Sequence, residues 1–200
     1  AIDYRGIKGV ATAIGHAPVA GMVDPAAGSV LSIAETLTNL VWAPLEDGIK
    51  SVSLSANWMW PCKNPGEDAR LYKAVEAASD FAVSLGINIP TGKDSLSMTQ
   101  KYRDEVVFSP GTVIISAAAE VSDPVKIIEP VLRNEPDSII VYIDLSRDEL
   151  KTGGSAFAQS LNKLGNKAPG IRDTEYFISA FNLIQKLITE EEIISGHDIS

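Results

Sequence analysis

Residues 24–41, DPAAGSVLSIAETLTNLV, are the stretch that decides the fold. Asp24-Pro25 restricts the backbone just before the segment, and apolar residues then recur at spacings of three and four. This pattern predicts an amphipathic helix of about four turns. The rest of its surface is small or weakly polar, apart from Glu35 and Asn39, which makes those two side chains stand out.

Strand-like and helical segments alternate on either side of this helix. The pattern predicts strands at 9–14, 49–54, 87–89, 112–121 and 138–145, and helices at 68–85, 156–164 and 175–188. A turn is expected at 15–18 and loops at 55–62 and 90–95. Such alternation indicates an α/β or α+β layered fold. Pro124, Pro130 and Pro136 indicate a domain boundary, and we place a connector at 126–136, between a domain at 1–125 and a second at 137–200.

Composition excludes several classes of protein. The 200 residues include 17 basic and 26 acidic side chains, a net charge of −9, so a nucleic-acid-binding face is not expected. Uncharged stretches are too short to cross a membrane, and the pattern of a secretory leader is not seen, so we do not expect a secreted protein. One cysteine, Cys62, fits a reducing compartment, so we expect a cytoplasmic protein. Phosphate ligands stay open, because backbone amides and metal ions bind phosphate without net positive charge.

The ends of the sequence differ from those of a whole gene product. It begins at Ala1 without methionine and stops at Ser200, directly after an apolar and acidic segment. We therefore expect a piece of a longer chain.

Glu35 and Asn39 form the first candidate site. Residues i and i+4 of a helix share a face, and a carboxylate and an amide oxygen one turn apart suit a hard cation such as Mg²⁺ that also bridges to phosphate. The alternative is an ordinary solvated helix face, which the spacing alone favours.

The segment Gly92–Ser97 is the second candidate. Glycine allows close approach of a phosphate, and Lys93 and Ser95 supply donors, although a polar turn explains the same residues. Asn57, at the end of an expected strand, is placed to face a ligand, while Trp58 and Trp60 are expected to pack inside.

Four further features carry weaker signals. Asp198, beside His197, is a candidate metal ligand. Cys62 has no basic neighbour that would activate it, and His16 fits a structural turn. The Gly153-Gly154-Ser155 segment is open to two readings, an anion site at a helix start or a closely packed helix entry.

Taken in order, these segments resemble one family, the phosphoribosylformylglycinamidine synthases (FGAM synthetases). The resemblance covers nearly the whole chain and rests on the order of its motifs. They are DPAAGS at 24–29, ETLTN at 35–39, SANWM at 55–59, GEDA at 66–69, PTGKDSLSM at 90–98 and HDIS at 197–200. It implies the second synthetase-like half of the long single-chain form. The expected fold is an aminoimidazole ribonucleotide synthetase-like N-terminal domain followed by a truncated C-terminal α/β domain.

The resemblance also implies chemistry and partners. The family is an ATP- and glutamine-dependent ligase of purine biosynthesis that converts formylglycinamide ribonucleotide to its amidine. Its expected cofactors are Mg²⁺ and ATP or ADP. Expected partners are the first synthetase-like half and the glutaminase domain of the same chain, and the isolated piece is expected to be inactive and homodimeric. Neither nucleic acid nor a membrane is an expected partner.

Site residues carry over one by one. Glu35, Asn39 and Asp198 match Mg²⁺ ligands, and Gly92 and Ser200 match nucleotide contacts. Lys93 and Ser95 match contacts to substrate phosphate. Lys93 stands where short-chain relatives have an asparagine metal ligand, which favours direct phosphate contact at that position.

Two alternatives remain at this point. This half is either a contributor to the ligase site or a structural, nucleotide-stabilised interaction module with the catalysis elsewhere. Selenophosphate synthetase, another branch of the superfamily, is the weaker alternative, because its expected N-terminal cysteine loop is not seen.

Overall fold

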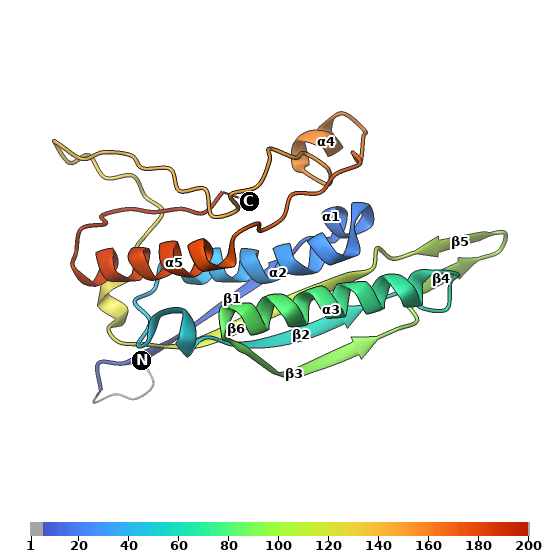
Figure 1. The fold of residues 1–200 in the computed structure, drawn as a ribbon, viewed down its shortest axis with the longest axis horizontal. Helices are drawn as coiled ribbons and strands as arrows, with labels where there is room; N and C mark the ends of the chain where they lie inside the picture. The colour runs from blue at the N-terminus through green and yellow to red at the C-terminus, as the bar shows by residue number, and fades with distance from the viewer. Residues whose placement is uncertain (1–5, 200) are drawn as a thin grey trace.

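A computed structural model describes residues 6–199 and confirms the mixed α/β class. Its centre is a four-stranded sheet in the order β1-β6-β2-β3. Figure 1 shows helices on one side of this sheet and a small hairpin projecting from one end. The strands are β1 (Gly9–His16), β2 (Ser53–Met59), β3 (Asn88–Ser95), β6 (Thr112–Val121) and, in the hairpin, β4 (Thr99–Tyr102) and β5 (Glu105–Phe108).

Three helices near the sheet and two later ones complete the fold. The helices are α1 (Pro18–Val23), α2 (Pro25–Leu40), α3 (Glu67–Leu85), α4 (Ala156–Ser160) and α5 (Thr174–Thr189), with 3₁₀ turns η1 (Gly48–Ser51) and η2 (Pro124–Lys126). The expected helices at 24–41, 68–85 and 175–188 are therefore confirmed, and the one at 156–164 is shorter than expected.

The sheet has one buried face and one open face. Along β6, Val113, Ile115, Ala117, Ala119 and Val121 are buried beneath the helices, and the residues between them point the other way. The two-residue period of a strand produces this alternation. On the opposite side no helix among residues 6–199 covers the sheet, so its outward side chains form an open face.

Helix α2 fits the sheet closely because small residues line its contacts. A Cβ atom on Gly15 of β1 would lie 2.3 Å from the backbone nitrogen of Thr36. A Cβ on Gly28 would lie 2.4 Å from the Cα of Gly21 in α1. Ser29 is buried and donates from Oγ to the Ala74 carbonyl of α3 at 2.8 Å. The small face of α2 is thus a packing surface for three neighbouring elements.

Helix α5 packs against the same core from the far end of the chain. Phe177 and Phe181 are fully buried, and Phe177 meets Phe81 of α3 edge to face at 6.0 Å. The buried Gln185 accepts from Leu45 N at 2.7 Å and donates to the carbonyls of Val41 and Ala43. The division into 1–125, 126–136 and 137–200 stays a prediction, and α5 shares its core with the first of these segments.

Three expected segments near the sheet, a turn, a strand and a loop, were wrong at their boundaries. Gly15 and His16 continue β1 because they pair with Ile115 and Ile114. The expected strand at 49–54 begins as the 3₁₀ turn η1, which Gly48 enters with a φ of +53°. The expected loop at 55–62 begins instead as strand β2, which pairs with β6 on one side and β3 on the other.

The expected loop at 90–95 is also a strand. Residues 88–95 form β3, the parallel edge partner of β2. Glycine, proline and lysine argue against a central strand, but an edge strand tolerates all three.

The expected strand at 138–145 is not formed in the described structure. Its residues belong to no ladder among residues 6–199, and Ile139, Ile140, Val141 and Tyr142 are exposed. The sequence has strong strand propensity, but a strand is defined by the partner that receives its hydrogen bonds.

We predict that Gly28→Ala destabilises the fold. The added methyl group would press against the α1 backbone at Gly21, which cannot move aside as a flexible side chain would. Overpacking of this kind lowers the free energy of unfolding by about 1–3 kcal/mol. Urea denaturation measures it, with Gly170→Ala as the control, because a Cβ there meets its nearest neighbour at 3.7 Å. Equal stability of the two variants would contradict the packing account.

Candidate functional site

The predicted metal pair lies on α2 beside the edge strand β1. Asn39 donates from Nδ2 to the carbonyl of Ile14 at 3.1 Å and to Oε1 of Glu35 at 3.4 Å. The i, i+4 geometry therefore brings both side chains together, as the sequence predicts. Because both of these bonds use the amide nitrogen of Asn39, its oxygen is the atom left to face a cation.

Asp198 lies in the C-terminal segment, which passes the end of α2. Gly196 packs against the Trp42 ring, where a Cβ would come within 2.0 Å of the ring carbon Cζ3. Trp42 follows Asn39 by three residues, so this segment reaches the same end of α2 as the predicted pair. Asp198 itself lies 3.4 Å from His197, between Oδ1 and Nδ1. Ser200 lies outside the described residues.

Residues 6–199 contain no group of three or more His, Cys, Asp or Glu side chains that could hold a metal. The predicted set has two carboxylates and one amide, so it is a different kind of group. Glu35, Asn39 and Asp198 therefore stay predicted ligands.

Gly92, Lys93 and Ser95 lie on β3 at the other edge of the sheet. Lys93 pairs with Asn57 and Ser95 with Met59, and the Lys93 Nζ donates to the Ser95 hydroxyl on the open face. Gly92 points the other way in register, and a Cβ there would meet the Ala56 carbonyl at 2.3 Å. Close packing against β2 therefore explains why a glycine stands at position 92. Its role in binding a nucleotide stays a prediction.

The two groups of predicted residues do not form one cluster. Strands β1 and β3 are the opposite edges of the sheet, and three strand spacings of about 4.8 Å separate them. One row of paired residues crosses the open face between the two edges. In this row His16 pairs with Ile114, Ile114 with Asn57 and Asn57 with Lys93. Sequence reasoning missed this row, because strand order is not a local property.

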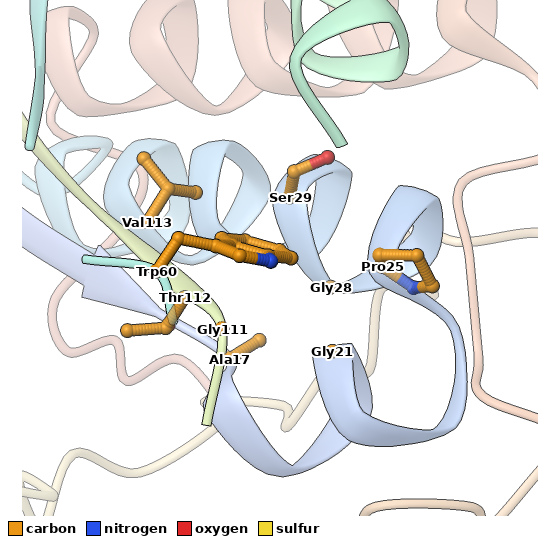
Figure 2. Close-up of a pocket in the computed structure, with 9 residues that line it drawn as sticks. All are labelled: Ala17, Gly21, Pro25, Gly28, Ser29, Trp60, Gly111, Thr112 and Val113. Carbon is orange, nitrogen blue, oxygen red and sulfur yellow. The ribbon is translucent and has the colours of Figure 1, made fainter. Parts of the chain in front are cut away.

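Trp60 closes the space between α1, α2 and α3. Its ring is 1% exposed, and its Nε1 donates to Glu67 at 2.9 Å. Figure 2 shows the ring against Gly111 and near Ser29, with Gly21 and Gly28 opposite each other. The gap that remains holds about 10 Å³, the room of roughly one water molecule. This region is core and confirms the expectation that Trp60 packs inside.

Two other candidates also have structural explanations. A Cβ on Gly154 would lie 2.5 Å from the Ala20 backbone of α1, and Ser155 caps the short α4 through Ala158 N. The close-packed helix entry is therefore what the structure shows at that segment.

Burial raises the pKa of the Cys62 thiol, and the carboxylates of Asp68 and Glu67 raise it further. Cys62 is thus poorly suited to act as a nucleophile.

A hollow at the start of α5 was not anticipated. It has a volume of about 440 Å³ and is lined by two arginines, two acids and a threonine, namely Arg147, Arg172, Asp173, Thr174 and Glu175. Arg147 lies over the Tyr176 ring at 4.8 Å and 3.5 Å from Asp173. These contacts already use the Arg147 charge to hold its loop against α5.

A model of a known protein family matches more than half of the chain. The family model described as "FGAR-AT PurM_N-like domain" matches residues 1–120. That range contains the whole sheet except its last strand residue, and includes Glu35, Asn39, Lys93 and Ser95.

Curated relatives match the whole chain. A probable phosphoribosylformylglycinamidine synthase, chloroplastic/mitochondrial, from Arabidopsis thaliana is 40% identical over 98% of this chain and 14% of its own length. The phosphoribosylformylglycinamidine synthase of Homo sapiens is 38% identical over 100% of this chain and 15% of its own length. The chain therefore spans about one seventh of the length of these relatives.

A solved structure shares the fold. PurL from T. maritima complexed with FGAR matches 96% of this chain and 29% of its own, with a TM-score of 0.63 and 13% identity. The agreement over almost all residues supports the arrangement of the later segments as well as the sheet.

Within residues 6–199 there is no helix that combines the length and the apolar character needed to cross a bilayer. The cytoplasmic location stays a prediction, and the Arabidopsis relative is named as a chloroplastic/mitochondrial protein.

Proposed function

The chain belongs to the FGAR-AT PurM_N-like domain family of the phosphoribosylformylglycinamidine synthases, and from this we propose that it is the nucleotide-binding segment of such an enzyme. The whole enzyme is an ATP- and glutamine-dependent ligase that converts formylglycinamide ribonucleotide to the amidine. This segment belongs to its second synthetase-like half. Its partners are the first half and the glutaminase domain, and the cofactors are Mg²⁺ and ATP or ADP.

The Glu35–Asn39 pair is the observation that carries the proposal. A carboxylate and an amide lie one turn apart on α2, and the amide nitrogen is anchored to the edge of the sheet at Ile14. This anchor fixes the rotamer of Asn39, so its oxygen is oriented without help from a ligand. Oxygen ligands held in this way fit Mg²⁺, which keeps several waters and binds nucleotide phosphates.

Asp198 would complete the set from the C-terminal segment. The contact between Gly196 and Trp42 supports this role, because it holds the segment near the end of α2 that carries Asn39. Ser200 is proposed as a nucleotide contact two residues further on. When bound, Mg²⁺ neutralises charge on the phosphates and holds them in position.

Lys93 and Ser95 are proposed to bind a phosphate at the β3 edge. Lysine brings a compact charge with three donors, one of which the Ser95 hydroxyl accepts, and that hydroxyl can donate in turn. Gly92 is proposed to allow the nucleotide to approach the backbone. Because α2 and β3 flank opposite edges of the sheet, these residues serve a different part of the bound molecules from the metal pair.

A structural role for the nucleotide is the second candidate function. The metal pair packs against β1 through the Ile14 carbonyl, and α2 contacts α1, α3 and the sheet. A ligand held by this helix would therefore stabilise much of the domain, because binding to the folded state alone raises stability. In this version catalysis takes place elsewhere in the full enzyme.

We predict that Glu35→Gln weakens binding of Mg²⁺–ADP to this chain by roughly tenfold or more, because a charged oxygen ligand becomes a neutral one. Isothermal titration measures it, with Glu76→Gln on the exposed side of α3 as the matched control. An unchanged affinity of Glu35→Gln for Mg²⁺–ADP would contradict the proposal that Glu35 and Asn39 bind the metal. In the full-length enzyme the same variant separates the two roles: lost rate at an unchanged melting temperature indicates a catalytic metal, and a lowered melting temperature with released nucleotide indicates the structural one.

We also predict that the isolated chain forms a homodimer through its open sheet face. Val10 and Ile14 are 57% and 59% exposed on this face, which the first synthetase-like half would cover in the full enzyme. Sedimentation at micromolar concentration is expected to give twice the chain mass, and Ile14→Lys is expected to give a monomer. A monomeric parent chain would contradict this.

A further inference from the structure

Trp42 lies just beyond the end of α2, and its backbone is held on both sides. The side-chain amide of Gln185 in α5 donates to the carbonyls of Val41 and Ala43, the two residues that flank it. Gln185 is buried, and hydrogen bonds away from water are electrostatically stronger than exposed ones. Trp42 is therefore fixed in place three residues after Asn39, in the part of the chain that follows the last turn of α2.

A connected set of contacts holds the C-terminal segment against Trp42. The Trp42 carbonyl accepts from Ile128 N at 2.9 Å. The carbonyl of the next residue, Glu129, accepts from Gly196 N at 3.2 Å. Gly196 itself lies so close to the Trp42 ring that a Cβ atom there would come within 2.6 Å of three ring carbons. The segment that contains Gly196 is thus held both by the backbone beside Trp42 and by the ring.

Asp198 follows this contact by two residues. Burial alternates along the segment, because the His197 side chain is 70% exposed and that of Asp198 only 14%. Such alternation is typical of an extended segment, in which residues two apart share a side. Asp198 therefore faces the same side as Gly196, toward the protein. A movement of Gly196 away from the ring would carry the Asp198 carboxylate with it.

We propose that Trp42 is a positioning residue of the metal site, because its ring holds Gly196 and so keeps the Asp198 carboxylate within reach of a cation at the metal pair. The inference rests on the proposed metal site and adds to it the residue that orients its third ligand. Position 196 has to be glycine in this arrangement, because any side chain would collide with the indole ring. Replacing a residue that orients a metal ligand typically lowers metal affinity about 10–100-fold.

The test is isothermal titration of Mg²⁺–ADP into the 200-residue chain and its variants. Gly196→Ala is expected to weaken binding about tenfold, because the added methyl group displaces the segment from the ring. Gly170→Ala is the matched control and is expected to bind like the parent, since a Cβ there meets its nearest neighbour at 3.7 Å. Equal affinity of Gly196→Ala and the parent would overturn the inference.

A compensating change separates positioning from a general loss of stability. The Trp42 Nε1 is buried and has no hydrogen-bond partner among residues 6–199, so Trp42→Phe reduces the ring without breaking a bond. Combined with Gly196→Ala, the smaller ring leaves room for the methyl group, and most of the lost affinity is expected to return. A double variant that melts like the parent and still binds as weakly as Gly196→Ala would contradict the proposal.

A double-mutant cycle shows whether Gly196 acts through Asp198. Asp198→Ala removes the ligand, so Gly196→Ala is expected to cause no further loss of Mg²⁺–ADP affinity in that background. Two losses that simply add would mean that Gly196 affects binding independently of Asp198, and the positioning role would be overturned. This cycle needs no rescue by Trp42→Phe, so it decides the question even where the compensated variant does not fold.

Failure of the inference can be told apart from failure of the proposed function. If Glu35→Gln weakens Mg²⁺–ADP binding and Asp198→Ala does not, the metal pair stands and the inference is overturned, because Asp198 is then no ligand to be positioned. Failure of the parent chain to bind Mg²⁺–ADP would contradict the metal site itself, and the inference with it.

Discussion

The close contact of α2 with the sheet is the constraint on which the rest of the structure depends. Gly15 lets β1 approach the backbone of α2, and Gly28 lets α1 approach it from the other side. The small residues bury less apolar side chain than larger ones would. Buried hydroxyls add hydrogen bonds at the same contact, and Thr36 donates to the carbonyls of Ser32 and Ile115. A helix held this closely cannot rotate or slide. The side chains on the rest of its surface, the half-buried Glu35 and the exposed Asn39 among them, therefore keep a fixed relation to the edge of the sheet.

The packing of the helices on one side leaves two edges and one face of the sheet uncovered by helices among residues 6–199, and the proposed function uses these surfaces. With all helices near the sheet on one side, its outward residues face the space that a ligand or another synthetase-like half would occupy. The proposed metal pair lies at one edge of the sheet, and Lys93 and Ser95, proposed to bind phosphate, lie at the other. Asn57 and Ile114 lie between the two edges. The chain has a net charge of −9, yet Lys93 and the Ser95 hydroxyl supply a cation and a donor where a phosphate is proposed to bind. Local chemistry rather than net charge decides that site.

Sequence alone predicted features that depend on one element and missed those that depend on pairing. The period of 24–41 predicted α2, and the spacing of Glu35 and Asn39 predicted their contact, because both follow from helix geometry. Strand β3 was expected to be a loop because Gly92 and Lys93 argue against a strand until the edge position is known. For residues 138–145 the opposite error occurred: a strand was predicted and none is formed, because high strand propensity does not supply a partner strand. The distance between the metal pair and Lys93 depends on strand order, which no local pattern contains.

The central claim is that α2 presents a divalent cation site at the β1 edge, distinct from the phosphate site at β3. A crystal of the 200-residue chain grown with Mn²⁺ and ADP tests this directly, because Mn²⁺ scatters anomalously and takes the oxygen ligands of Mg²⁺. The account predicts an anomalous difference peak within coordinating distance of Glu35 and Asn39. A peak confined to the β3 edge beside Lys93, or nucleotide bound with no peak at α2, would contradict it.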